Sequence, residues 1–177
     1  MTIDELRNHI RVIEDFPKPG IHFQDITTLL IDPECLNELI DRMVEHYKDK
    51  GITKVVGLES RGFILAPAVA ARLGAGFVVA RKHGKLPGSK YTETYELEYG
   101  HDSIEMHTGT IGPDDVVLVH DDLLATGGTM AAAYRLIRKF GASRIYFNTM
   151  IELTKVPRLQ EFPTDIPLYS IIPVDVD

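Results

Sequence analysis

The chain has little cysteine, no tryptophan and no long apolar stretch. Its 177 residues include one cysteine. A lone cysteine, Cys35, cannot form an internal disulfide, and this usage is typical of proteins from a reducing cytosol. No apolar run reaches the roughly 18 residues that suggest a membrane span, and the polar first residues do not resemble a signal peptide. We therefore expect a cytoplasmic protein that does not cross a membrane, with Cys35 in its core. No cluster of cysteines and histidines in the sequence suggests zinc.

Acidic residues outnumber basic ones, 26 to 19, for a net charge of −7. This balance argues against nucleic acid as a partner. Residues 61–92 nevertheless contain no acidic residue, and their six cations are Arg61, Arg72, Arg81, Lys82, Lys85 and Lys90. Subtracting this +6 from the net −7 leaves −13 for the rest of the chain. A basic stretch in an acidic protein is a candidate site for a small polyanion, and the alternative is a solvated basic surface.

The length predicts a single domain over residues 1–177, and the pattern of elements predicts its class. Apolar positions 3, 6, 10 and 13 predict a first helix, and Asp32 before Pro33 predicts the start of a second. We expect strands at 54–58, 76–80, from 116, at 144–151 and at 168–172, helices ending near 73 and at 140, and an antiparallel pair at 95–99 and 104–107. Residues 82–94, polar and containing Gly and Pro, are expected to be mobile. Strands that alternate with helices imply a mainly parallel central sheet flanked by helices, with ligands beyond the carboxyl ends of the strands.

The most informative segment runs from Val116 to Met130. An apolar strand leads into the adjacent carboxylates Asp121 and Asp122, and a glycine-rich turn then opens a helix. Backbone amides at such a turn suit a phosphate, although no lysine follows as in a Walker loop. A diol beside that phosphate would donate hydrogen bonds to the two carboxylates, which describes a ribose 5-phosphate. The alternative is a solvated acidic pair beside an ordinary connection.

This segment resembles the signature of the type I phosphoribosyltransferases, in their adenine-specific form. The resemblance covers nearly the whole chain through five further blocks, at residues 15–26, 57–63, 81–88, 97–100 and 152–154. It implies the type I phosphoribosyltransferase fold, with an N-terminal hood within residues 1–35 and a flexible lid hairpin at about 82–107. The implied reaction is adenine plus 5-phosphoribosyl 1-pyrophosphate (PRPP) giving AMP and pyrophosphate in purine salvage.

The resemblance also implies the roles of residues. Asp121 and Asp122 would hold the ribose hydroxyls, and the 5-phosphate would bind Ala125, Thr126, Gly127, Gly128 and Thr129. Pyrophosphate would meet Glu59, Ser60, Arg61, Arg81, Lys82 and Lys85, some of them from a partner subunit, since the family is dimeric. Family members often have a cis non-proline peptide in the loop at residues 59–62. Mg²⁺ would be held mainly by PRPP, and we expect no direct protein ligand to it.

The base would lie under the hood, with Phe23 against one face, Leu153 against the other, and His22 and Tyr99 also in contact with substrate. Glu98, on the lid, is the candidate general acid or base. The alternatives are that Phe23 and Leu153 are core residues and that Glu98 belongs to a solvated strand face. Two positions depart from the family pattern: Gln24 stands where many members have arginine, and His120 where an aliphatic residue is usual. We interpret His120 as a buried, hydrogen-bonded histidine.

Two rival functions remain. One is a phosphoribosyltransferase for hypoxanthine, guanine or a pyrimidine, although a 6-oxo group would favour a lysine near the base and residues 152–154 contain none. The other is a PRPP-sensing regulator that retains the fold without the chemistry. Such a regulator would normally need an effector domain or a basic surface for nucleic acid.

Overall fold

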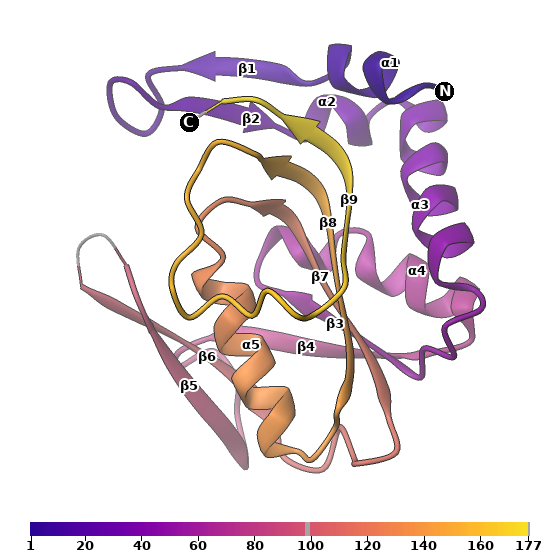
Figure 1. Cartoon of the computed structure of the whole chain (residues 1–177), viewed down its shortest axis with the longest axis vertical. Coiled ribbons are helices and arrows are strands. Elements are labelled where there is room, and N and C mark those ends of the chain that lie inside the picture. Colours follow the sequence, from indigo (N-terminus) through magenta and orange to yellow (C-terminus); the bar gives the residue numbers. More distant parts are fainter. Residues whose placement is uncertain (98–99, 177) are drawn as a thin grey trace.

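A seven-stranded sheet forms the centre of the computed structural model, which describes residues 1–97 and 100–176 (Figure 1). The strand order is β5-β6-β4-β3-β7-β8-β9. The strands span β3 (Lys54–Leu58), β4 (Gly76–Lys82), β5 (Lys90–Glu96), β6 (His101–His107), β7 (Val116–Leu124), β8 (Arg144–Leu153) and β9 (Leu168–Val174). From β4 to β9 through β3, β7 and β8 the neighbours are parallel, whereas β5 and β6 are antiparallel additions. The expected mainly parallel sheet is confirmed.

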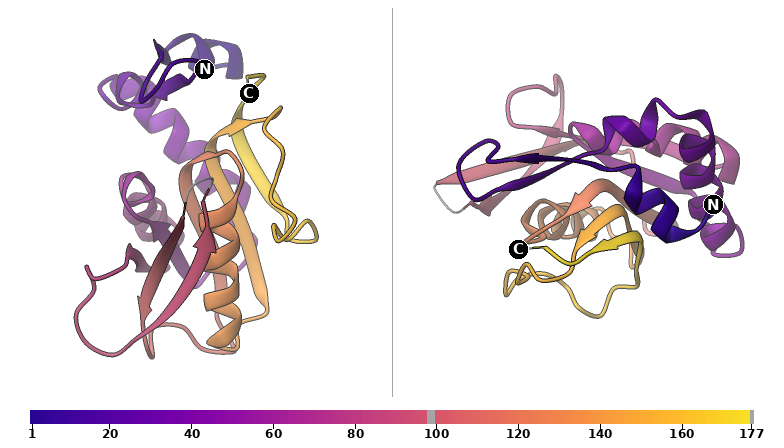
Figure 2. Two further views of the ribbon diagram at one scale, coloured as in Figure 1. Left: turned by 90° about the vertical axis from the view of Figure 1, so that its left-hand side faces the viewer. Right: turned by 90° about the horizontal axis from the view of Figure 1, so that it is seen from above.

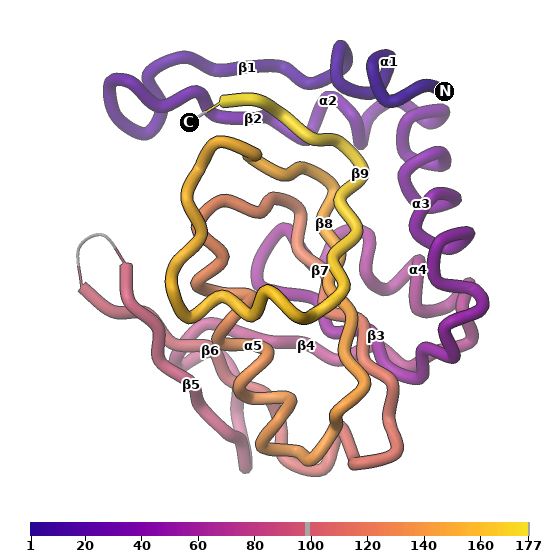
Figure 3. Tube along the Cα trace, in the orientation of Figure 1, coloured from indigo at the N-terminus to yellow at the C-terminus, as the bar shows by residue number. Residues whose placement is uncertain are grey.

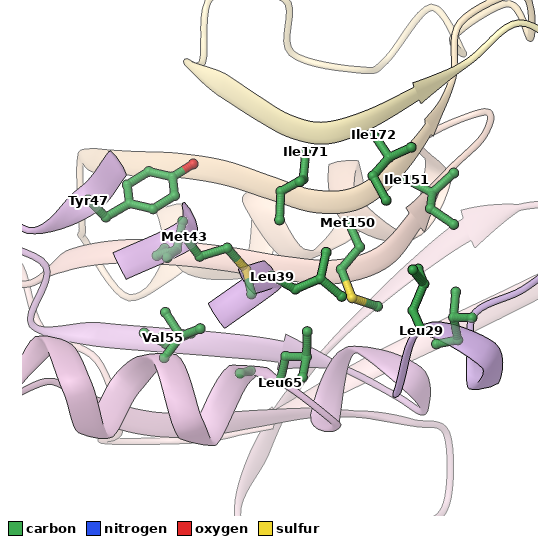
Figure 4. Packing of buried hydrophobic residues seen from close by; sticks show 14 of the residues in the cluster. Leu29, Leu39, Met43, Tyr47, Val55, Leu65, Met150, Ile151, Ile171 and Ile172 are labelled. Atoms are coloured by element: carbon green, nitrogen blue, oxygen red, sulfur yellow. The ribbon is translucent and has the colours of Figure 1, made fainter. Parts of the chain in front are cut away.

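Helices cover both faces of this sheet, as expected. Helices α3 (Pro33–Tyr47) and α4 (Ala66–Leu73) pack on one face, and α5 (Gly128–Lys139) packs on the other. Figure 4 shows the hydrophobic core on the α3 and α4 side of the sheet, in which Leu39 and Met43 of α3 meet Met150 of β8. Cys35 is fully buried in the same cluster, as expected. None of the helices in the described ranges has the length and apolar character needed to span a membrane.

The start of α3 follows directly from the sequence. Asp32 is the N-cap, and its Oδ1 accepts hydrogen bonds from the amides of Glu34 at 2.8 Å and Cys35 at 3.1 Å. Pro33 occupies the first turn, where the missing N–H costs nothing because that amide has no helical partner.

The predicted first helix is wrong beyond its first two turns. Helix α1 spans Ile3–Asn8, and β1 (Arg11–Glu14) then pairs antiparallel with β2 (His22–Asp25). Short helix α2 (Thr27–Leu30) leads on to α3. Leu6 is the buried residue of α1, whereas Ile10 follows the helix and packs against the core, and Ile13 lies in β1, so the helical spacing of these positions was coincidental. The two strands lie above the carboxyl ends of β7, β8 and β9, where both chain ends are also found (Figures 2 and 3).

Two strands differ from expectation in extent. Strand β7 continues to Leu124 because it pairs with β8 as far as Glu152, so the acidic pair lies within the strand and not beyond it. Strand β5 occupies residues expected to be a mobile segment and pairs with β6 from Lys90 to Glu96. The preceding turn is anchored, because Leu86 is buried and Lys90 Nζ donates to the Leu86 carbonyl at 2.7 Å.

Candidate active site

Two loops meet at the carboxyl ends of the paired strands β3 and β7. One carries Glu59, Ser60 and Arg61, and the other follows Leu124. The first loop lies so close to strand β7 that a Cβ on Gly62 would lie 2.8 Å from the His120 carbonyl oxygen and 3.2 Å from Asp121 Oδ1. Glycine at position 62 is therefore required by packing. The peptide bond between Glu59 and Ser60 is cis, as the family resemblance implied for this loop.

The acidic pair is held in two different environments. Asp121 Oδ1 accepts the amide of Asp122 at 2.9 Å, and burial, followed by the charge of Asp122, raises the pKa of Asp121 well above its usual range. Asp122 is buried, and its Oδ2 lies 2.9 Å from Arg61 Nε. This contact is an ion pair without hydrogen-bond geometry, and Oδ2 has no hydrogen-bond partner among the described residues. Oδ2 can therefore still accept a hydrogen bond. The two carboxylates could accept hydrogen bonds from a diol, as the sequence suggested.

The loop after β7 forms a cavity of about 130 Å³ lined by Asp121 and by residues 123–130. No side chain caps the start of α5, so its first amides face the loop without a side-chain acceptor. Gly127 has φ +85°, and a Cβ there would lie 2.9 Å from Phe162 Cε2. The side of Gly127 on which a side chain would lie is therefore occupied by an aromatic ring.

Residues far along the chain hold the same loop, and the sequence analysis missed them. Leu159 donates its amide to the Thr126 carbonyl at 2.9 Å, and Arg158 donates from Nη1 to the Ala125 carbonyl. Arg158 is itself held by Glu152 at 2.7 Å. No local pattern announces these contacts, because residues 33 positions apart meet only in the folded domain.

The predicted pyrophosphate cations divide into two groups. Glu59 is buried, and it accepts hydrogen bonds from Lys85 Nζ at 2.8 Å, the Lys82 amide at 2.7 Å and Arg81 Nε at 3.3 Å. Burial raises the pKa of Glu59, but these bonds outweigh burial and lower it overall, so the carboxylate stays ionised. Arg81 and Lys85 thus converge on Glu59. The side chain of Lys82 instead bonds to Asp102 and to Tyr95 Oη.

The hood brings Phe23 to the site. The Arg61 guanidinium carbon lies 5.3 Å from the centre of the Phe23 ring, and Phe16 meets that ring edge-on at 5.3 Å. His22 pairs with Glu14, while Gln24, buried, donates from Nε2 to the His22 carbonyl at 3.0 Å. The hood therefore contacts the loop after β3 through Arg61, although Gln24 does not provide the charge that arginine would.

The remaining candidate site residues come from β8, the lid and β7. Leu153 ends β8 and is half-buried against the core. Glu98 and Tyr99 lie outside the described residues. Tyr95 is buried and Glu96 exposed, but β5 ends at Glu96 and Leu97 is 49% exposed, so the expected alternation does not extend to Leu97. His120 is buried, and its Nδ1 lies 2.6 Å from Asn148 Oδ1. The interpretation of His120 as a hydrogen-bonded histidine is confirmed at Nδ1, while Nε2 has no partner among the described residues.

Comparison with known proteins agrees with this geometry. A family model described as "Phosphoribosyl transferase domain" matches residues 26–164. The chain is 56% identical over 172 residues to an adenine phosphoribosyltransferase of Phocaeicola vulgatus, covering 97% of this chain and 99% of the relative. Its fold matches the crystal structure of an enzyme of the same name from Giardia lamblia, complexed with 9-deazaadenine, with a TM-score of 0.92, 42% identity and 99% coverage of both chains. A Saccharomyces cerevisiae structure containing adenine gives a TM-score of 0.89 at 35% identity, covering 96% of this chain and 98% of the other.

Proposed function

The chain belongs to the phosphoribosyl transferase family, and we infer that its reaction is the one its adenine-specific relatives are named for. It is a pentosyltransferase that converts adenine and PRPP to AMP and pyrophosphate in purine salvage. The observation that carries this conclusion is identity of about half the residues over nearly the whole length of such enzymes. The arrangement at the carboxyl ends of β3 and β7 supports it, because two neighbouring carboxylates, uncapped helix amides and several cations lie close together there.

The chemistry separates charge, and the proposed residue roles follow from that. As the bond from ribose C1 to pyrophosphate breaks, positive charge develops on the ring and negative charge on the leaving group. Asp121 and Asp122 would accept hydrogen bonds from the ribose hydroxyls. Residues 125–129 would hold the 5-phosphate with backbone amides and the Thr126 and Thr129 hydroxyls. These contacts fix C1 in place while the base approaches.

Residues from two segments of the chain would bind the pyrophosphate leaving group. Ser60 and Arg61 belong to the loop after β3, and Arg81 and Lys85 are already gathered by Glu59. Lys82 would have to exchange its contacts with Asp102 and Tyr95 to reach the same anion. Mg²⁺ is the proposed metal, and it would be held mainly by PRPP and pyrophosphate oxygens, since it prefers oxygen ligands and retains water.

We place adenine between Phe23 and Leu153, with His22 and Tyr99 also in contact with substrate. Stacking between apolar side chains suits a flat purine. Glu98 is the proposed acid or base at the imidazole ring of adenine, in a lid hairpin that closes over the site. The 6-oxopurine alternative is not favoured, because the relatives that match over nearly the whole chain are adenine enzymes.

We also propose a cytoplasmic homodimer. The apolar side chains of Ile64 and Phe77, 45% and 36% exposed, lie beside the loop after β3, and Phe63 meets Phe77 edge-on. A second copy of the chain covering this surface would bury them next to the proposed pyrophosphate site. Sedimentation of the native protein and of an Ile64→Glu variant tests this, with a monomeric native protein as the contradicting outcome.

Pyrophosphate release with Mg²⁺, PRPP and each of adenine, hypoxanthine, guanine and orotate tests the reaction. Adenine should be turned over far faster than the others, and comparable rates with hypoxanthine would contradict the proposal. Binding of PRPP without AMP formation would instead support the alternative that the protein is a PRPP-sensing regulator without catalytic activity.

Asparagine variants of Asp121 and Asp122 test the ribose site. Each would lose charge-assisted hydrogen bonds worth about 1.5–3 kcal/mol, so kcat/KM should fall roughly 10- to 100-fold for at least one of them. Asp114→Asn, at an exposed position before β7, is the matched control and should be unaffected. Unchanged kinetics in both variants, with folding intact, would contradict the assignment of Asp121 and Asp122 to the ribose site.

A further inference from the structure

Three potential metal ligands meet at the base of the hood, away from the active site. His9, Asp32 and Cys35 each offer one ligand atom, and these atoms all lie within 4.8 Å of one another. His9 Nε2 and Asp32 Oδ2 are 3.9 Å apart. The residues come from the C-cap of α1, the N-cap of α3 and the first turn of α3. We call these three residues the neck site.

Each side chain is oriented for coordination by contacts that use its other atoms. His9 Nδ1 lies 2.8 Å from the Glu5 carbonyl, which fixes the tautomer so that Nε2 carries the free lone pair. Asp32 uses Oδ1 to cap α3, which leaves Oδ2 available. The Cys35 thiol has only a weak contact to Met1 Sδ, at 3.8 Å. A metal could therefore bind all three ligand atoms without breaking the helix cap.

We propose that the neck site binds one Zn²⁺ through His9 Nε2, Asp32 Oδ2 and Cys35 Sγ, with water as the fourth ligand. Zinc takes four ligands in tetrahedral geometry and accepts nitrogen, oxygen and sulfur together. Mg²⁺, which prefers six oxygen ligands, does not match a set containing a thiol and an imidazole. The half-exposed side chains of His9 and Asp32 leave an open side through which the ion and its water can enter.

The site lies where the hood joins the domain. Strand β1 begins two residues after His9, and α2 ends two residues before Asp32, so the whole β1–β2 sheet falls between two ligands. A metal at this point would close the 22 residues between His9 and Asp32 into a loop and fix both of its ends to α3. The hood carries Phe23, but the zinc proposal does not depend on the reaction proposed above.

Binding must displace a proton. Burial, followed by the charges of Asp32 and Glu34, raises the pKa of the Cys35 thiol, so the free protein holds it protonated at neutral pH. Hydrogen bonds from the Cys35 and Glu34 amides lower the pKa of Asp32, which stays ionised. As the S–Zn bond forms, the S–H bond breaks and one proton passes to solvent, while the imidazole binds in its neutral form.

The test uses full-length protein stripped with a chelator and dialysed against Zn²⁺ or Co²⁺. We expect one zinc ion per chain, bound in the micromolar range or tighter, a rise in Tm with zinc, and a thiolate-to-cobalt absorption band. Excess Mg²⁺ should not displace the ion. Titration in buffers of different ionisation enthalpy should show one proton released per zinc.

His9→Gln is the informative variant, because His9 is exposed and its replacement should leave the fold intact. It should abolish stoichiometric binding and the zinc-dependent rise in Tm, as should Cys35→Ser, and Asp32→Asn should weaken binding while preserving the helix cap. His101→Gln, at an exposed position on β6, is the matched control and should bind like the native protein. Failure of the native protein to retain zinc, or equal binding by His9→Gln, would overturn the proposal.

Discussion

Replacing Gly127 by alanine should destabilise the domain through two separable effects. The residue has φ +85°, and an L-residue in the left-handed region costs about 1–2 kcal/mol. The added Cβ would also lie 2.9 Å from Phe162 Cε2 and closer still to Cδ2, in a buried region. Overpacking of a core typically costs about 1–3 kcal/mol. Together these give an expected loss of about 2–5 kcal/mol.

A double-mutant cycle separates the two effects. In a Phe162→Ala background the ring is absent, so Gly127→Ala should cost only the backbone part, about 1–2 kcal/mol. The coupling between the two substitutions should therefore be about 1–3 kcal/mol. Equilibrium unfolding in urea of the native protein, both single variants and the double variant measures it. The KM for PRPP should rise in Gly127→Ala, because the start of α5 moves with the loop.

Gly109 provides the control. It has φ +76°, but a Cβ there would meet nothing within 4 Å, so Gly109→Ala carries the backbone cost alone. This variant should show no coupling to Phe162→Ala. If Gly127→Ala proves no more costly than Gly109→Ala, or if removing the ring gives no relief, the assignment of this glycine to packing against Phe162 is wrong.

Three further predictions address two parts of the lid hairpin and the hood. Glu98→Gln should lower kcat at least tenfold, within the range for general acid–base catalysis, with little change in the PRPP KM, whereas Glu96→Gln should stay within about twofold; equal behaviour would place Glu98 on a solvated face. Trypsin should cut near Lys82, Lys85 or Lys90 in the free protein and more slowly with PRPP and Mg²⁺, and equal rates would show that the ligand does not protect this segment. Asp25 has its pKa lowered to about 2 by hydrogen bonds from Thr27 and Arg11, so its stabilisation is present above the ordinary carboxyl pKa and is lost as pH falls from about 4 to 2. Urea unfolding curves taken between those pH values measure the free energy of unfolding. In Asp25→Asn this free energy should fall less steeply with decreasing pH than in the native protein, and an unchanged slope would contradict the prediction.

The sequence predicted those features that depend on short stretches of chain. Strand β3 has the predicted limits, and α3 begins at the predicted cap, since Asp32 and Pro33 act within one helical turn. The loop proposed to bind the 5-phosphate could be located because its strand, glycines and helix are consecutive. Buried apolar runs between turn signals likewise determined the fold class.

Features that depend on distant partners could not be predicted. Ile10 and Ile13 fit a helical period, yet α1 ends at Asn8, and Ile13 lies in strand β1, where it pairs with Phe23 of β2 ten residues further along the chain. Strand β7 extends through the acidic pair because β8 continues beside it. The sequence likewise gives no reason to connect Phe162 with Gly127, since their contact exists only after the connection to β9 folds back over the loop.

Ion pairs change the interpretation of the basic stretch at residues 61–92. The cations nearest the proposed site already have carboxylate partners: Arg61 with Asp122, Arg81 and Lys85 with Glu59, and Lys82 with Asp102. An incoming pyrophosphate would therefore have to compete with these carboxylates for the cations that it binds. Arg61 has a particular consequence, since its guanidinium holds the Asp122 carboxylate and covers the Phe23 ring. Drawing Arg61 toward pyrophosphate would free Asp122 for the ribose and Phe23 for the base in a single movement. The three parts of the proposed site are thus coupled through one side chain.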